Sequence, residues 1–371
     1  MKKSIFLLGS IFGIALLTSC GSDDGGGGSD DMDDIIPDLV VPTVYTSADY
    51  AANTTAESTV IDELSTMTDD VNAAESNAQS TEVSAITYPS TLSSVTLSSY
   101  ESLVSEWLVE IVSAANDDDG FQNPGEGTPA EGEEGGLLGS RLLDENGLEL
   151  EQLVQKGSFG AALYNHALSV INTGDLTDPG TIDKLVEIHG TEPTFDPEST
   201  TAAATYSRRR SNQTTQTGFF YDIQTNLLIA QAAIAAGSDY DALRDQALAD
   251  YLDAWERSNF ATVIYYCNST KVQLQEAGED ADALGNALHA YAEGVGFTHG
   301  FRGISNKTIT DAQIDSILDL LLAPAGDTPE SFKFLNDASL LNNLDDIIED
   351  IQDIYGFTDD EVETFFVNDP S

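Results

Sequence analysis

YLDAWERSNFATVIYYCN, residues 251–268, lies in the longest helical stretch of the chain, which we expect to run from Asp239 to about Gln275. Apolar residues recur through this stretch at the spacings that place side chains on the faces of an α-helix. They are Leu243, Ala247, Leu248, Tyr251, Leu252, Trp255, Phe260, Val263, Ile264 and Tyr266. A helix with so much apolar surface must be covered by other helices.

Helical periodicity continues along most of the chain, whereas period-2 runs typical of strands are scarce. The further helices that we expect are Val60–Val71, Tyr100–Val112, Leu148–Ile171, Thr181–His189, Phe219–Ala236, Ala281 to about Gly300, Asp311–Leu322, Leu340–Tyr355 and Asp359–Phe366. The sequence therefore predicts an all-α, multi-helix bundle of about nine helices. It forms one large domain over residues 37–371, or two lobes that divide near residues 174–218.

Two local features refine this prediction. Thr310 and Thr358 each precede a predicted helix, where a hydroxyl oxygen can accept a hydrogen bond from an unpaired amide. Gly157 and Gly160 lie inside the helix from Leu148, where each glycine costs about 1 kcal/mol relative to alanine. We expect these two glycines to allow another helix to approach closely.

The N-terminus has the features of a secretory signal. Lys2 and Lys3 precede the apolar run Ile5–Leu17, which is too short to span a bilayer permanently, and small residues follow. The sequence Leu-Thr-Ser-Cys at 17–20 resembles the cleavage and lipidation box of bacterial lipoproteins. That resemblance implies removal of residues 1–19, diacylation of Cys20 and attachment to a membrane through the lipid. The alternative is an ordinary secreted protein.

Residues 20–36 should form a flexible tether behind Cys20. The stretch GSDDGGGGSDDMDD (21–34) holds six aspartates and five glycines and cannot bury enough apolar surface to fold. An acidic run at this position resembles the surface-export signal of Bacteroidetes lipoproteins. The resemblance implies an outer-membrane protein that faces the cell exterior, and the periplasmic face is the alternative.

The charge of the chain limits its partners. Without residues 1–19, the chain has 12 basic and 64 acidic side chains, a formal charge of −52. Such a surface repels phosphates, which argues against nucleic-acid binding, and attracts cations such as Ca²⁺. The acidic loop Asn116–Gly136 is one candidate calcium site, although it lacks the DxDxDG spacing of a calcium-binding loop. Cys267 is the remaining cysteine and is expected to be buried.

Several segments resemble, in their order, a family of Bacteroidetes lipoproteins defined by domain of unknown function 4856. They are LELEQLVQKGSFGAALYNHAL (148–168), VEIHGTE (186–192), YLDAWERSNFATVIYYCN (251–268), ALHAYAEGVGF (287–297) and ITDAQIDSIL (309–318). The family's form of the second segment contains another histidine and a Trp-Asp pair. Ile188, Gly190 and Thr191 occupy those places here, so a function that needs the missing groups is not implied.

The same segment is similar, more weakly, to the GxHxxE motif of imelysin-like proteins, which are helical envelope lipoproteins linked to iron. His189 and Glu192 match the HxxE part, and Glu187 stands where the motif has glycine. Imidazole and carboxylate ligands suit transition metals such as iron or zinc. The competing interpretation is structural. Gly190 and Pro193 favour a helix end, where a cationic His189 would interact favourably with the helix dipole.

His289 and Glu293 form a second candidate pair. Their spacing of four places them on one face of a predicted helix, where they can bind a metal or simply interact with each other. Glu256, beside Trp255, is a further candidate ligand. The candidate metal ligands are therefore His189, Glu192, His289 and Glu293, and a shared site requires the two pairs to converge.

Sequence motifs of common enzyme classes, including GxSxG, the Walker loop and HExxH, do not occur. Our leading hypothesis is a non-enzymatic, lipid-anchored envelope protein that binds a ligand. Iron or zinc is the candidate ligand, and an envelope transporter is a candidate partner. One alternative is a metal-assisted hydrolase with Glu192 or Glu293 as general base. A structural or adhesion protein is the other.

Overall fold

The computed structural model describes residues 38–125, 129 and 134–370. The predicted signal peptide, Cys20 and the tether lie outside these residues, as does part of the acidic loop. The chain from Leu39 onward forms one compact unit, which includes segment 174–218.

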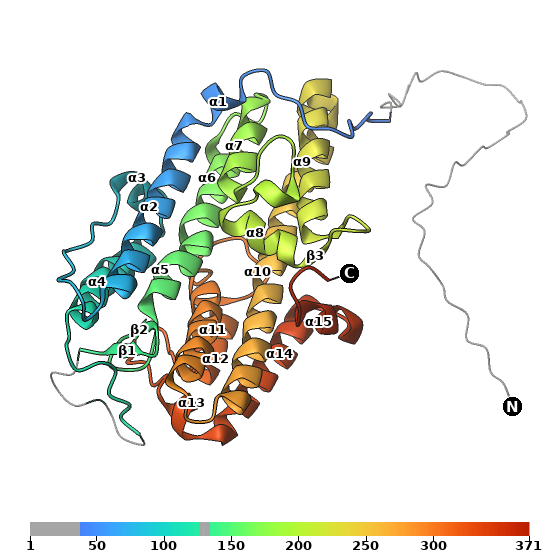
Figure 1. Ribbon diagram of the computed structural model, residues 1–371. Coiled ribbons are helices and arrows are strands. Elements are labelled where there is room, and N and C mark those ends of the chain that lie inside the picture. The colour runs from blue at the N-terminus through green and yellow to red at the C-terminus, as the bar shows by residue number, and fades with distance from the viewer. Residues whose placement is uncertain (1–37, 126–128, 130–133, 371) are drawn as a thin grey trace, which may run out of the picture. The chain divides into compact units, whose positions relative to one another are not determined.

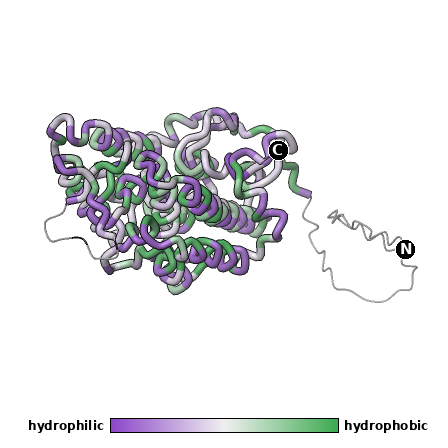
Figure 2. Tube along the Cα trace, turned by 60° about the horizontal axis from the view of Figure 1, so that its bottom comes forward, coloured by the Kyte–Doolittle hydropathy of each residue, from purple (hydrophilic) through white to green (hydrophobic). Residues whose placement is uncertain are grey.

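The centre of the bundle is α10 (Asp241–Ala277), which is buried on several faces between Arg244 and Thr270 (Figure 1). Helices α9 (Phe219–Ala236), α11 (Ala281–His299) and α14 (Leu341–Tyr355) pack against it. Helix α5 (Leu150–Ser158) packs on α11, and α2 (Thr55–Asn77) and α4 (Ser98–Ala115) pack on α5. Hydrophobic and hydrophilic residues alternate along most helices, as expected for elements with one buried face (Figure 2).

Shorter elements complete the fold. The remaining α-helices are α1 (Tyr50–Asn53), α3 (Ser90–Val95), α6 (Asn165–Thr173), α7 (Gly180–His189), α8 (Ala202–Arg209), α12 (Asp311–Leu320), α13 (Lys333–Asn336) and α15 (Asp359–Phe365). A π-helical segment, η1 (Phe159–Tyr164), joins α5 to α6, and 3-10 turns occur at η2 (Pro197–Ser199), η3 (Ser238–Tyr240) and η4 (Ala338–Leu340). Two antiparallel hairpins pair β1 (Gly136–Leu138) with β2 (Arg141–Leu143) and β3 (Ser211–Asn212) with β4 (Thr217–Gly218).

The structure confirms the all-α prediction and corrects the number of helices. The expected number is exceeded because η1 divides the expected helix Leu148–Ile171 into α5 and α6, and because α1, α3, α8 and α13 have four to eight residues each. So few residues do not show a helical period in the sequence. The predicted caps are present, since Thr310 and Thr358 each form a capping box at the start of α12 and α15.

Glycines allow α5 and α11 to cross at close range, as the sequence predicts for Gly157 and Gly160. A Cβ atom on Gly300 would lie 2.2 Å from the carbonyl oxygen of Gly157, and one on Gly160 would lie 2.7 Å from that of Gly300. A Cβ atom on Gly157 would lie 1.6 Å from the Tyr100 hydroxyl. Side chains larger than hydrogen therefore do not fit at this crossing.

Residues 45–58, near the N-terminal end of the described chain, are fastened to α7 by side-chain hydrogen bonds. Asp183 accepts hydrogen bonds from the Tyr45 hydroxyl (2.7 Å), Ser47 (2.8 Å) and the Asn53 amide (2.7 Å). One turn later, Glu187 accepts from Tyr50 (2.8 Å) and Ser58 (2.7 Å). None of the helices among the described residues has both the length and the apolar composition needed to cross a membrane.

Candidate metal centre

Three glutamates from two helical elements meet at one end of α5. Glu75 lies in the last turn of α2, Glu149 is the residue before α5, and Glu151 lies in the first turn of α5. Each offers a carboxylate oxygen, and these oxygens lie within 4.8 Å of one another. We call Glu75, Glu149 and Glu151 the carboxylate cluster. The start of a helix is a favourable place for such groups, because its free amides carry partial positive charge.

The cluster is largely removed from water. The side chain of Glu149 is fully buried, that of Glu75 is 15% exposed, and Glu151 is also buried. Burial, reinforced by repulsion from Glu149, raises the pKa of Glu75 to about 7 and that of Glu151 to about 8. Ionisation of Glu75 and Glu151 is therefore less favourable than it is in water.

Arg141 and Lys156 are basic side chains near the cluster, and Arg141 lies farther from it than a normal hydrogen bond. Arg141 places its Nη1 atom 3.6 Å from Glu75 and 3.8 Å from Glu149. Lys156 is buried and lies 3.2 Å from Glu293, which belongs to the neighbouring α11. Burial would lower the pKa of Lys156, but nearby Tyr206 and Glu293 outweigh it and raise the pKa.

His289 connects the cluster to Glu293. Its Nδ1 atom lies 2.8 Å from one oxygen of Glu149, and its Nε2 atom lies 3.7 Å from Glu293. Burial would lower the pKa of His289, but the hydrogen bond and charge of Glu149 outweigh it and raise the pKa. The predicted pair His289 and Glu293 is thus brought together, and His289 also contacts Glu149 of the carboxylate cluster.

The β1–β2 hairpin covers the cluster from the solvent side. The backbone amide of Leu142 donates a hydrogen bond to Glu75 (3.0 Å), and Arg141 donates to Asn286 (3.1 Å) on α11. Gly285 permits this contact, because a Cβ atom there would lie 2.3 Å from the carbonyl oxygen of Leu138. The hairpin therefore fixes the position of Arg141 above the carboxylates.

Gln152, one turn into α5, is 2% exposed and leaves one oxygen without a partner. Its amide nitrogen donates to Glu151 (2.9 Å), with a longer contact of 3.4 Å to Glu149. Its Oε1 atom is buried and accepts no hydrogen bond among the described residues. A buried acceptor without a donor is unfavourable, and the side of the Gln152 amide that faces the carboxylates is its nitrogen.

The other predicted pair, His189 and Glu192, does not come together. His189 is fully buried, with Nε2 3.1 Å from the Ser207 hydroxyl and its ring edge-on to Trp255. Glu192 is exposed and accepts a hydrogen bond from Thr194. The contacts of His189 are with residues of α8 and α10, whereas those of His289 are with Glu149 and Glu293.

The structural interpretation of residues 186–193 correctly predicted a helix end at Gly190, but it was wrong about the positive charge of His189. Helix α7 ends at His189, and Gly190 adopts a left-handed conformation with φ of +94°, as a helix-terminating glycine does. Burial lowers the pKa of His189 to about 3, so the ring is neutral and is not the cationic cap that we expected. Glu187, which stands where the imelysin-like motif has glycine, accepts hydrogen bonds from Tyr50 and Ser58.

Residues of two other candidate sites make structural contacts. Glu256 accepts hydrogen bonds from the amides of Thr308 and Ile309 (2.9 Å each) and from the Tyr355 hydroxyl (2.8 Å). In the acidic loop, the Asn116 side chain pairs with both backbone groups of Val83.

Sequence reasoning missed the carboxylate cluster. The alternation of Glu149 and Glu151 at the start of a helix was a usable signal, since it places two acids at one helix terminus. Glu75 lies more than seventy residues earlier and has no local signal. Its role depends on how α2 packs on α5.

Comparisons with known proteins identify no relative of this chain. No protein-family model, no curated protein and no solved structure matches this chain. The resemblances to the domain 4856 family and to imelysin-like proteins therefore stay predictions.

Proposed function

We propose that this protein is a cell-envelope lipoprotein, anchored through Cys20 at the outer membrane and facing the cell exterior, that binds a divalent cation at the carboxylate cluster. The anchor and location rest on the sequence of residues 1–36. The observation that carries the binding function is the convergence of Glu75, Glu149 and Glu151 within 4.8 Å in a buried position.

Charge balance supports a cation at this place. When ionised, the cluster and Glu293 carry four negative charges, and their described basic neighbours are Arg141, Lys156 and His289. Even with a protonated His289, the fully ionised group has a net negative charge in a region of low dielectric, and the raised pKa values of Glu75 and Glu151 reflect the cost of that charge. Uncompensated buried charge is strongly unfavourable, and a divalent cation would compensate it.

The donor atoms indicate which cations fit. Carboxylate and amide oxygens suit Ca²⁺ and Mn²⁺, whereas the expected iron or zinc favours sites with more nitrogen ligands. His289 contributes one imidazole, whose Nδ1 atom is paired with Glu149 and so orients that carboxylate. We therefore rank Mn²⁺ and Ca²⁺ ahead of Fe²⁺ and Zn²⁺.

Metal binding is tested on the mature chain from residue 20 with Cys20→Ala, after treatment with a chelator. We expect Mn²⁺ or Ca²⁺ to raise the melting temperature, because a ligand at 100 times its Kd stabilises the folded state by about 2.7 kcal/mol. Glu149→Gln should abolish this rise, and Glu192→Gln, the same change at an exposed position, should leave it intact. A melting temperature that no divalent cation changes would sink the proposal and favour a structural cluster.

Arg141 provides a variant with the opposite effect. Its guanidinium competes with a bound cation, so Arg141→Gln should tighten cation binding about tenfold, equivalent to about 1.4 kcal/mol. The matched control is Arg302→Gln, because Arg302 forms its ion pair with Asp315, outside the cluster. Isothermal titration measures both dissociation constants, and weaker binding by the Arg141 variant would contradict a cation site at this place.

The hydrolase alternative has less support from the geometry. Glu192 is exposed and outside the cluster, and Glu293 is held by Lys156 at 3.2 Å. The carboxylate of Glu293 is thus engaged by a buried cation and is not free to face a metal-bound water. Neither glutamate is therefore positioned as the general base of a metal-bound water.

A further inference from the structure

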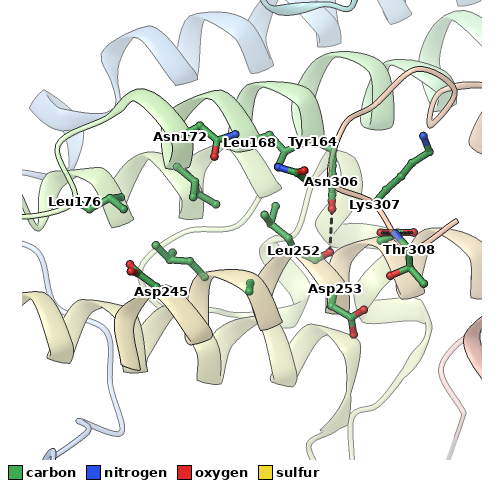
Figure 3. A pocket seen from close by; sticks show the side chains of 14 residues that line it. Tyr164, Leu168, Asn172, Leu176, Asp245, Leu252, Asp253, Asn306, Lys307 and Thr308 are labelled. Atoms are coloured by element: carbon green, nitrogen blue, oxygen red, sulfur yellow. Dashed lines mark hydrogen bonds between the residues drawn. The ribbon is translucent and has the colours of Figure 1, made fainter. Parts of the chain in front are cut away.

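A groove separate from the carboxylate cluster runs between α6 and α10 (Figure 3). Its volume is about 620 Å³, which lies within the range of small-molecule sites. Leu168 on α6 and Leu248 and Leu252 on α10 supply apolar lining, and Tyr164 of η1 lies at the same wall (Figure 3). We call this space the α6–α10 groove.

Side chains of α10 fix both ends of the groove. At one end, Arg244 donates a hydrogen bond to the carbonyl oxygen of Leu176 (3.3 Å), which lines the groove after α6. At the other end, Glu256 holds the amides of Thr308 and Ile309 at 2.9 Å. Because these contacts do not involve a ligand, the groove is preformed, which reduces the entropic cost of binding.

Among the described charged side chains at the groove, one carboxylate has no ion pair or hydrogen bond. Lys307 is bound to Asp311 at 2.5 Å, and Asp245 is bound to Arg244 at 2.7 Å. Asp253 is exposed at the groove and accepts no hydrogen bond among the described residues. Burial raises the pKa of Asp253, and the positive charge of Arg257, one turn further along α10, partly offsets that rise. Asp253 also borders a second hollow that it shares with Arg257.

We propose that the α6–α10 groove binds a small amphipathic organic cation, with an apolar body on Leu168, Leu248 and Leu252 and a protonated amine at Asp253. Amide groups of Asn172 and Asn306 at the rim can accept further hydrogen bonds from the amine. The negative charge of the whole chain favours the approach of a cation over that of a fatty acid. This ligand class does not depend on the metal site.

The experiment compares three probes that share an eight-carbon chain: octylammonium, octanol and octanoate. Each is titrated below its aggregation concentration into the mature chain with Cys20→Ala, and heat is recorded. We expect octylammonium to bind at least tenfold more tightly than octanoate, with octanol between them. Equal binding of octanoate and octylammonium, or binding of neither, would overturn the proposal.

Variants locate the ligand. Ala249→Leu places a larger side chain in the groove at an exposed helical position and should abolish octylammonium binding. Asp253→Asn should weaken octylammonium binding about tenfold and leave octanol unchanged. Asp250→Asn removes the same charge from the same helix outside the groove lining and should change affinity less than twofold.

Two further outcomes decide between sites. Unchanged binding by Ala249→Leu would show that the probe binds elsewhere on the acidic surface and would overturn the proposal. Glu149→Gln should leave octylammonium binding intact, so failure of the metal proposal and failure of this one are distinguishable.

Discussion

His189 is a neutral side chain in the interior, and this has a consequence for stability at low pH. Burial lowers its folded-state pKa to about 3, whereas an unfolded chain has a value near 6.5. Above pH 6.5 the ring is neutral in both states and its contribution is constant. Below pH 6.5 only the unfolded ring takes up a proton, so folding loses about 1.4 kcal/mol per pH unit from this residue.

Replacement by glutamine tests this pH dependence. In His189→Gln, an amide nitrogen can keep the contact with Ser207 and does not titrate. We expect the variant to be less stable than the parent at pH 7.5, and to recover about 2.5 kcal/mol relative to the parent between pH 6.5 and 4.5. Urea unfolding at several pH values measures the difference, which should be equal at pH 7.5 and 8.5. A difference that stays constant down to pH 4.5 would contradict the neutral assignment.

At the scale of elements, the packing of α5 against α4 and α11 depends on glycine. Gly157→Ala would place a Cβ atom 1.6 Å from the hydroxyl of Tyr100 on α4, which itself donates a hydrogen bond to Leu153 (2.6 Å), and 3.2 Å from the carbonyl oxygen of Gly296 on α11. We expect a loss of about 3 kcal/mol or more in the free energy of unfolding, because overpacking forces α5 away from α4.

Gly294→Ala on α11 is the matched control for that variant. Its Cβ atom would meet Tyr266 at 3.4 Å, an ordinary contact, and alanine is the better helix former. We expect its stability to change by less than about 1 kcal/mol. Chemical denaturation compares the two variants, and equal effects would show that the crossing is not a tight fit.

The elements that the sequence predicted are those with a long apolar period. Helix α10 and the close approach at Gly157 and Gly160 followed from spacing alone. Helices α3 and α8 did not, since six and eight residues carry too little periodic signal. The π-helical segment η1 was missed for another reason: its sequence, FGAALY, has the composition of an ordinary helix.

The candidate site was only partly predictable, because it forms at the scale of the whole molecule. The spacing of His289 and Glu293 on one helix identified neighbours of the carboxylate cluster. Glu75 and Glu149 could not be joined to that pair without the packing of α2 on α5 and of α5 on α11. His189 and Glu192 failed as a pair because the turn at Gly190 separates a buried helix end from an exposed loop.

The fastening of the N-terminal segment to α7 makes a prediction about the molecule as a whole. Asp183→Asn weakens the acceptor of Tyr45, Ser47 and Asn53, so amides in α1 and in the first turns of α2 should exchange with solvent faster. Amides of α10 should be unaffected. Asp175→Asn, an exposed change just before α7, is the control. Hydrogen exchange followed by mass spectrometry measures both, and equal protection in the two variants would contradict a local role.

That fastening also constrains the order in which the chain can fold as it is made. The hydroxyl and amide groups between Tyr45 and Ser58 find their acceptors 129 to 138 residues later in the sequence. At typical rates of synthesis, this interval lasts on the order of 10 s. The first part of the folded region to emerge therefore stays without these acceptors until α7 has been made, and a chaperone that shields an emerging chain would have time to act here.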